Sequence, residues 1–185
     1  MAENIQFNKK TLFILFLGVL LTAFLGVMAG SYFMQMRAEK QHKAGENLKL
    51  KVGQVFPDYN FNSLAGERNQ LYQLLDGKKA VLLFISTDCG ACGPETQKWS
   101  VSYPQTSSQY AVLGIASEIP SAIKEFQISK NLSFPLYYDS LGKFTNEYKI
   151  DAYPTLVGLN EKKEIVFIEF GHKKDKSVQD FLNRL

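Results

Sequence analysis

The sequence predicts an α/β fold, in which a mixed sheet is flanked by helices and preceded by one N-terminal transmembrane helix. From residue 51 onward, segments patterned like strands alternate with segments patterned like helices, which is typical of a sheet covered on both faces. The two cysteines of the 185-residue chain lie together at the end of an apolar run. Residues 11–36 carry no charged side chain, and about 20 apolar residues are enough for a helix to cross a bilayer.

The N-terminal apolar segment, residues 11–36, is interpreted as an uncleaved membrane anchor, because a buried core helix should carry a polar face. The alternative is a cleaved signal peptide, since Val27-Met28-Ala29 resembles a small-residue cleavage site. Basic residues flank both ends of the segment, so charge alone orients it weakly. We expect a cytoplasmic tail over 1–10, a linker over 37–50 and a single domain over 51–185.

The first half of the domain leads up to a central strand. The run Ala80-Val81-Leu82-Leu83-Phe84-Ile85 is uninterrupted and rich in branched residues, which indicates a buried strand. A helix follows, with Pro94 in its first turn, where the missing N–H costs little. The elements expected here are an extended segment over 56–61, a turn over 63–66, a short helix over 70–75, the strand over 80–86 and a helix over 90–102.

The second half of the domain continues the alternation and ends in a hairpin. Phe144 and Tyr148 are four residues apart, which is the spacing of an apolar helix face. The polar stretch over 160–163 predicts the turn of the hairpin. The elements expected here are strands over 110–116 and 134–138, helices over 121–131 and 141–150, hairpin strands over 154–159 and 165–171, and a closing helix over 177–185.

The pair Cys89-Gly90-Ala91-Cys92 is predicted to be a redox-active dithiol. Its first thiol faces the positive end of the following helix, which favours the thiolate. A zinc site needs four ligands, and His42 and His172 supply no second pair at ligand spacing. A structural disulfide across so short a loop constrains little of the unfolded chain. A peroxidatic cysteine requires an upstream proline, where this sequence has Leu82.

The composition argues against nucleic-acid binding and predicts no cofactor. The formal net charge is +3 at pH 7, and no basic patch interleaved with aromatic residues occurs along the chain. Dithiol exchange proceeds between sulfur atoms and needs no metal, nucleotide or haem. We therefore expect no cofactor, no metal site and no nucleic-acid partner.

Short motifs between residues 51 and 171 match one family in their order and spacing. They are Val52-Gly53 with Phe56-Pro57-Asp58, Leu64-x-Gly66 followed by Leu71, the strand leading into Cys89-x-x-Cys92, Glu95, Phe134-Pro135 with Asp139 and Gly142, Tyr148-x-Ile150, and Tyr153-Pro154-Thr155-Leu156. Each motif alone is weak, but the set is specific. On these motifs the chain resembles the membrane-anchored TlpA/ResA-like thiol–disulfide oxidoreductases of the thioredoxin superfamily, which implies a thioredoxin-like fold.

The resemblance implies a role for Tyr153 and Pro154. In this family a proline at this position takes the cis form and lies against the dithiol, while the backbone of the preceding residue pairs with an extended substrate strand. Tyr153 and Pro154 are therefore expected to bind substrate. The alternative is a proline that simply opens an edge strand.

Two departures from the family pattern lie close to the cysteines. Asp88 stands where the family usually has tryptophan, and Leu83 replaces the buried acid with which thioredoxins move protons. A carboxylate at Asp88 places a like charge beside the Cys89 thiolate and raises the pKa of that thiol. Alternatively, Asp88 caps the following helix. Glu95, one turn past Cys92, is the nearest candidate for a base, unless it is a solvated surface residue.

These observations predict a thiol–disulfide oxidoreductase in the cell membrane, with its redox domain outside the cytoplasm. Cys89 is expected to attack a substrate disulfide and Cys92 to resolve the mixed disulfide. The charge at Asp88 favours reduction of the substrate. By resemblance, the substrates are exported proteins, apocytochrome c among them, and a membrane partner donates or accepts the electrons. The alternatives are a dithiol oxidase of exported proteins and a Sco-like copper-binding module, although that class has C-x-x-x-C spacing.

Overall fold

The computed structural model describes residues 9–43 and 45–185, which form two compact units. The first unit is the single helix α1 (Lys9–Lys43), and the second is the remainder of the chain. Most of the expected cytoplasmic tail, residues 1–8, lies outside the described residues. α1 continues through residues 37–43, so this part of the expected linker is helical.

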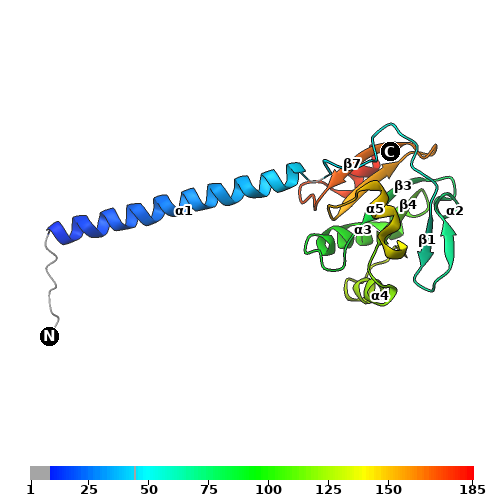
Figure 1. Ribbon diagram of the computed structural model, residues 1–185, viewed down its shortest axis with the longest axis horizontal. Coiled ribbons are helices and arrows are strands. Elements are labelled where there is room, and N and C mark those ends of the chain that lie inside the picture. The colour runs from blue at the N-terminus through cyan, green and yellow to red at the C-terminus, as the bar shows by residue number, and fades with distance from the viewer. Residues whose placement is uncertain (1–8, 44) are drawn as a thin grey trace. The chain divides into compact units, whose positions relative to one another are not determined.

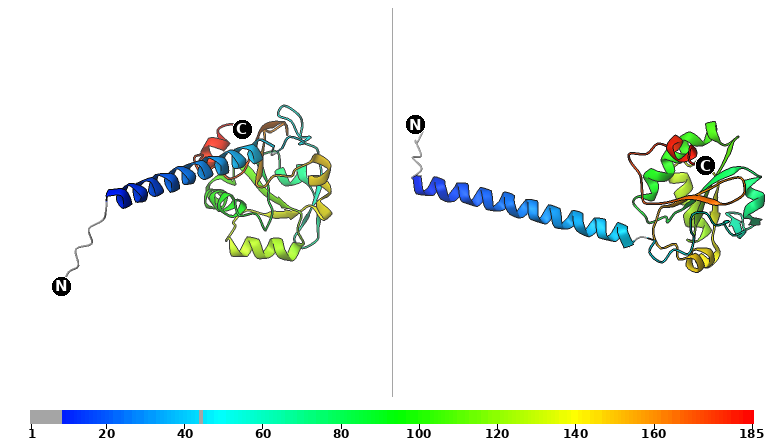
Figure 2. Two further views of the ribbon diagram at one scale, coloured as in Figure 1. Left: turned by 60° about the vertical axis from the view of Figure 1, so that its left-hand side comes forward. Right: turned by 90° about the horizontal axis from the view of Figure 1, so that it is seen from above.

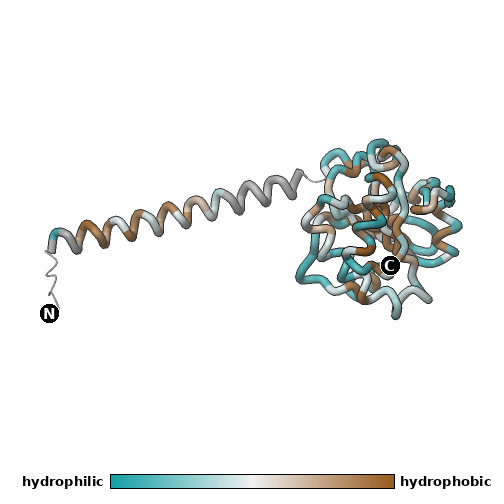
Figure 3. The backbone as a smooth tube through the Cα atoms, turned by 90° about the horizontal axis from the view of Figure 1, so that it is seen from below, coloured by the Kyte–Doolittle hydropathy of each residue, from teal (hydrophilic) through white to brown (hydrophobic). Residues whose placement is uncertain are grey.

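The apolar part of α1 is long enough to cross a membrane. The segment Phe13–Tyr32 has a mean hydropathy of 2.4, and its side chains are not buried against other parts of the protein. Figure 3 shows hydrophobic colouring along this stretch of the helix. A signal sequence near an N-terminus has a similar apolar character.

The second unit is built on one seven-stranded mixed sheet, in the order β2-β1-β5-β4-β3-β6-β7 (Figure 1). β3, β4 and β5 are parallel to one another, whereas the other neighbouring pairs are antiparallel. The sheet confirms the predicted fold class. The strands are β1 (Asn60–Ser63), β2 (Arg68–Gln70), β3 (Lys79–Phe84), β4 (Tyr110–Ala116), β5 (Leu136–Tyr138), β6 (Thr155–Leu159) and β7 (Ile165–Phe170).

Helices cover both faces of the sheet, as the two views of Figure 2 show. The helix expected over 141–150 is divided, because Leu141 and Gly142 have φ values of 57° and 61° and interrupt it. The closing helix expected over 177–185 is shorter and begins with a capping box between Ser177 and Asp180. The helices of this unit are α2 (Leu71–Leu75), α3 (Cys92–Thr106), α4 (Pro120–Ser129), the 3₁₀ turn η1 (Ser140–Gly142), α5 (Lys143–Tyr148) and α6 (Val178–Leu182).

The central strand β3 is buried on both faces and separates two hydrophobic cores. Alternate side chains of a strand point to opposite faces, so Val81 and Leu83 pack in one core with residues of α3, α4 and α6. Leu82 and Phe84 pack in the other core with residues of α2 and α5. This burial explains why the strand reads as a continuous apolar run rather than an alternating pattern.

Phe144 of α5 lies at the centre of the second core. Its ring centroid lies between 4.5 and 5.7 Å from those of five other aromatic side chains, which are Phe56, Tyr59, Phe61, Phe84 and Tyr148. The buried carboxylate of Asp139, just after β5, holds α5 in place. It accepts hydrogen bonds from the N–H groups of Phe144 at 3.0 Å and Thr145 at 2.9 Å, and from the Thr145 hydroxyl at 3.0 Å.

We expect Asp139→Ala to lower the free energy of unfolding by about 2–4 kcal/mol, because it leaves buried donors at the start of α5 without an acceptor. Asp139→Asn, which keeps one acceptor oxygen, should lose less. Urea unfolding of the full-length chain in detergent measures both. An Asp139→Ala protein as stable as the parent would show that the carboxylate does not position α5.

Candidate functional site

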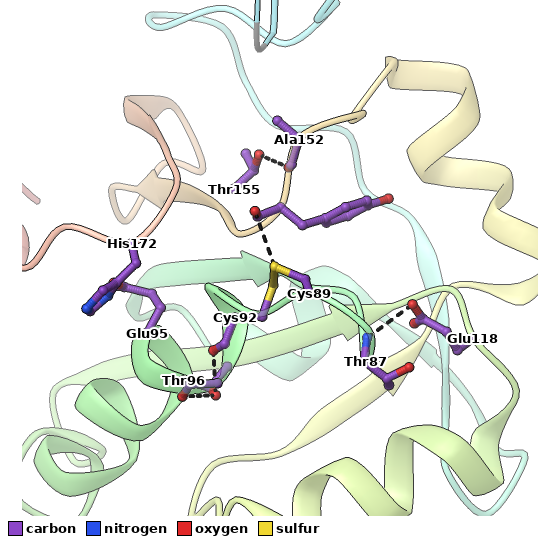
Figure 4. The surroundings of a disulfide bond; sticks show 11 residues. Thr87, Cys89, Cys92, Glu95, Thr96, Glu118, Ala152, Thr155 and His172 are labelled. Atoms are coloured by element: carbon purple, nitrogen blue, oxygen red, sulfur yellow. Dashed lines mark hydrogen bonds and ion pairs between the residues drawn. A yellow bond between two sulfur atoms is a disulfide. The ribbon is translucent and has the colours of Figure 1, made fainter. Parts of the chain in front are cut away.

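The cysteine pair lies where the central strand passes into α3. A disulfide joins Cys89 to Cys92, and their Cα atoms are 5.3 Å apart. Cys92 opens α3 and is fully buried in the first core, whereas Cys89 is only half-buried. Of the two sulfur atoms, therefore, the one accessible to a large partner is that of Cys89. Figure 4 shows the pair and the side chains around it.

The loop before β6 lies directly against Cys89. Thr155 pairs with Phe84 in the antiparallel ladder between β6 and β3, so the residues before Thr155 lie beside those that follow Phe84. The peptide bond between Tyr153 and Pro154 is cis. The carbonyl oxygen of Tyr153 lies 3.4 Å from Sγ of Cys89 (Figure 4). Strand register thus brings together two motifs that are far apart in the sequence.

Glu118, which lies two residues past the end of β4, contacts the loop that carries the cysteines, and the sequence analysis did not identify it. Its Oε1 accepts a hydrogen bond from the Thr87 N–H at 3.1 Å, and its Oε2 is buried without a hydrogen-bond partner among the described residues. Burial raises the pKa of Tyr153, and the charge of Glu118 raises it further. β3 and β4 are parallel and end level with each other, so their register is the signal that would have identified Glu118.

Asp88 is exposed, and its carboxylate makes no hydrogen bond within the described part of the chain. The N-cap position of α3 is occupied by Ala91, without a side-chain cap. The structure therefore does not support the alternative in which Asp88 caps α3. Together with Thr87 and residues of α4, Asp88 lines an open pocket of about 320 Å³ beside the cysteine loop.

Glu95 is fully buried and is not a solvated surface residue. Its Oε1 accepts from Nε1 of Trp99 at 3.0 Å and lies 2.8 Å from Nζ of Lys98. Its Oε2 lies 2.6 Å from Nδ1 of His172 and accepts from the backbone N–H of Lys173 at 3.3 Å. Both carboxylate oxygens of Glu95 are therefore already in contact with neighbouring polar groups.

His172 reaches this site through the hairpin of β6 and β7, a placement that the sequence analysis did not predict. Phe170, the last residue of β7, pairs with Thr155, so the residues that follow it lie near the loop of Tyr153 and Pro154. Figure 4 shows His172 and Glu95 on one side of the disulfide and Glu118 on the other. Across the residues that the structure describes, no group of three or more His, Cys, Asp or Glu side chains is arranged to hold a metal ion.

A family model and curated relatives match most of this chain. The model described as the AhpC/TSA family matches residues 52–168. The chain is 28% identical over 138 residues to the thioredoxin-like protein YneN of Bacillus subtilis, covering 72% of this chain and 80% of YneN. It is 22% identical over 174 residues to the thiol-disulfide oxidoreductase ResA of Bacillus cereus, covering 93% and 96% of the two chains.

Solved structures share the fold of the second unit. StoA from Bacillus subtilis superposes with a TM-score of 0.56 at 24% identity, covering 72% of this chain and 97% of StoA. A secreted disulfide oxidoreductase of Mycobacterium tuberculosis, described as homologous to Escherichia coli DsbE, superposes with a TM-score of 0.59 at 22% identity. That match covers 69% of this chain and 93% of the other.

Proposed function

The chain belongs to the AhpC/TSA family of thioredoxin-like proteins and is a thiol–disulfide oxidoreductase, and from this premise we propose that it reduces disulfides in exported proteins. The observation that carries the proposal is the pairing of a half-buried Cys89 with a fully buried Cys92, beside the carbonyl of Tyr153. The Cys89 sulfur can contact a protein partner, and the buried Cys92 sulfur is the proposed resolving thiol.

Cys89 is the proposed attacking thiol. It lies just before α3, whose N-terminal dipole favours a thiolate there. In the reducing direction the Cys89 thiolate attacks one sulfur of the substrate disulfide, and the other substrate sulfur leaves as a thiolate and takes up a proton. Cys92 then loses its proton and attacks the Cys89 sulfur of the mixed disulfide. The second substrate thiol is released, and the two electrons of the substrate's new dithiol come from Cys89 and Cys92.

Tyr153 and Pro154 are the proposed substrate-binding residues. The Tyr153 carbonyl faces Cys89 and lies at the edge of the loop rather than inside a strand. An extended segment of a partner protein can donate a backbone N–H to this carbonyl. A cysteine in that segment would then lie next to Cys89, because the Tyr153 carbonyl oxygen and the Cys89 sulfur are 3.4 Å apart. Backbone pairing of this kind accepts many sequences, which suits an enzyme that acts on several proteins.

The proposed direction of electron flow rests on Asp88. Its exposed carboxylate next to Cys89 disfavours the thiolate, which destabilises the reduced form relative to the disulfide and makes the couple more reducing. The opposite direction, oxidation of exported dithiols, uses the same residues. The redox potential of the Cys89/Cys92 couple decides between the two directions.

The proposed location is the cell membrane, with α1 as the anchor, residues 1–10 in the cytoplasm and the domain over 51–185 outside it. The span Phe13–Tyr32 supports an anchor by its length and hydropathy. The proposed partners are exported proteins with disulfides, apocytochrome c among them, and a membrane protein that donates the two electrons needed to reduce the enzyme again.

Cys92→Ser should accumulate mixed disulfides with protein substrates, because the resolving thiol is absent while Cys89 still attacks. Cys89→Ser is the matched control and should accumulate none. Non-reducing gel electrophoresis of the full-length variants after incubation with insulin measures the adducts. Adducts in Cys89→Ser but not in Cys92→Ser would reverse the assignment of the two thiols.

Asp88→Asn should lower the pKa of the Cys89 thiol, because it removes the negative charge beside the thiolate. It should also make the redox potential less reducing by up to about 30 mV, which corresponds to a tenfold change in equilibrium constant. Glu125→Gln removes another carboxylate from the same pocket without touching the cysteine loop, and we expect a smaller shift from it. Glutathione redox titrations compare the three proteins. An unchanged potential in Asp88→Asn would remove the basis for the reducing direction.

The proposed topology places the C-terminus outside the cytoplasm. A reporter that is active only in an oxidising compartment, fused after Leu185, should therefore be active in cells. A second reporter that works only in the cytoplasm should be inactive at the same position. Activity of the cytoplasmic reporter alone would rule out this topology.

A further inference from the structure

The Glu118 side chain makes one hydrogen bond within the described part of the chain, and that bond reaches the loop that carries the cysteines. Its Oε1 accepts from the Thr87 N–H at 3.1 Å, whereas its Oε2 is buried and has no partner among these residues. A carboxylate has sites to accept about four hydrogen bonds. The contact with Thr87 therefore accounts for the position of this carboxylate.

The hydrogen bond to Thr87 continues the ladder between β3 and β4 by one step. The last backbone contact between these parallel strands runs from the Ile85 N–H to the Ile115 carbonyl at 2.9 Å. The bonds of a parallel ladder are evenly spaced, so the next donor is Thr87, two residues later. Its acceptor is the Glu118 side chain instead of a backbone carbonyl. A side chain thus carries the register of the two strands past their ends.

Thr87 lies inside the turn that presents Cys89. The Cys89 N–H donates to the Ser86 carbonyl at 3.2 Å and closes this turn from Ser86 to Cys89, which we call the cysteine turn. Of the two central residues, Asp88 is exposed and makes no hydrogen bond within the described residues, whereas Thr87 is held by Glu118. The Glu118 contact is therefore the hydrogen bond that fastens the middle of the turn to the rest of the domain.

Glu118 is itself restrained from both directions along the chain. Before it, the Ser117 hydroxyl lies 3.1 Å from the Thr145 hydroxyl. After it, Ile119 is the N-cap residue of α4 and Pro120 is the first residue of that helix. The ring of a proline fixes its φ angle. The Glu118 side chain therefore extends from a restrained backbone and gives the cysteine turn a fixed point of attachment.

On its other side, the cysteine turn faces the loop of Tyr153 and Pro154. The Cys89 sulfur lies 3.4 Å from the Tyr153 carbonyl oxygen, and this distance depends on where the turn holds Cys89. Burial raises the pKa of Tyr153 and the charge of Glu118 raises it further, so the carboxylate lies within electrostatic reach of this loop as well. Figure 4 shows the hydrogen bond between Thr87 and Glu118 beside the cysteine pair.

We propose that Glu118 is a positioning residue, which holds the cysteine turn through the Thr87 N–H and so keeps the Cys89 sulfur beside the Tyr153 carbonyl. The proposal rests on the proposed function, in which Cys89 attacks a disulfide of a protein bound along that carbonyl. Glu118 does not touch the substrate. It affects the attack because the reacting sulfur atoms must be aligned, and a misplacement of about 1 Å can lower a rate by up to about 100-fold.

Single-turnover oxidation of the prereduced full-length chain by insulin, in detergent, measures this attack. Glu118→Ala removes the acceptor and should lower the rate at saturating insulin by about tenfold, while the half-saturating concentration stays within about twofold because the Tyr153 carbonyl still binds. Alkylation of Cys89 by iodoacetamide needs no docking and should stay within about twofold, because the dipole of α3 is unchanged. A Cys92 thiol that remains protected from iodoacetamide shows that the fold is retained.

Amide hydrogen exchange at Thr87 tests the hydrogen bond itself, without any substrate. Glu118→Gln keeps a carbonyl oxygen as acceptor, so it should retain protection of the Thr87 N–H and a rate within about threefold of the parent. Glu118→Ala should lose both. Glu125→Ala is the matched control and should change neither. Glu125 is an exposed carboxylate beside the same pocket as Thr87, and it makes no hydrogen bond within the described residues.

The proposal requires that protection at Thr87 and the rate at saturating insulin change together. A variant that loses the protection but keeps the rate, or keeps the protection but loses the rate, overturns it. Equal exchange at Thr87 in the parent and in Glu118→Ala also overturns it. If Glu118→Ala does not fold, Glu118→Asp, whose side chain is one methylene shorter, takes its place. A parent chain that does not reduce insulin contradicts the proposed function, whereas exchange at Thr87 still decides whether Glu118 holds the turn.

Discussion

The burial of β3 on both faces is the constraint on which the rest of the structure depends. Five of the six residues of this strand, 80–84, are fully buried, so neighbouring strands must satisfy its backbone on both edges. β4 pairs with it in parallel and β6 in antiparallel orientation. The end of β3 is therefore surrounded by the loops that follow β4 and precede β6. The cysteine pair lies at the point where these loops meet.

The site is thus a product of register more than of local sequence. Thr155 is paired with Phe84 on one side and with Phe170 on the other, which brings the loop of Tyr153 and Pro154 and the loop of His172 to the same end of the sheet. A slip of one residue in either ladder would turn the buried side chains of these strands to the wrong face. The hydrophobic cores that fix the register consequently fix the distance between Tyr153 and Cys89 as well.

The sequence was a good guide wherever a signal was local. The apolar run predicted β3, the uncharged segment predicted a helix long enough to span a membrane, and the C-x-x-C motif located the disulfide. The sequence did not predict contacts between residues that lie far apart along the chain. The burial of Glu95 depends on His172, 77 residues later, and nothing in the helix around Glu95 predicts that contact. Glu118 was missed for the same reason, since Thr87 lies 31 residues before it.

The unequal exposure of the two sulfur atoms also bears on chemical damage. A peroxide that reaches the domain meets Cys89 first and converts its thiolate to a sulfenic acid. Cys92 is within disulfide distance, with a Cα separation of 5.3 Å, so the sulfenic acid condenses with it and releases water. The product is the ordinary disulfide, which a dithiol donor reduces, rather than the irreversible sulfinic acid. The buried cysteine therefore protects its exposed neighbour from overoxidation.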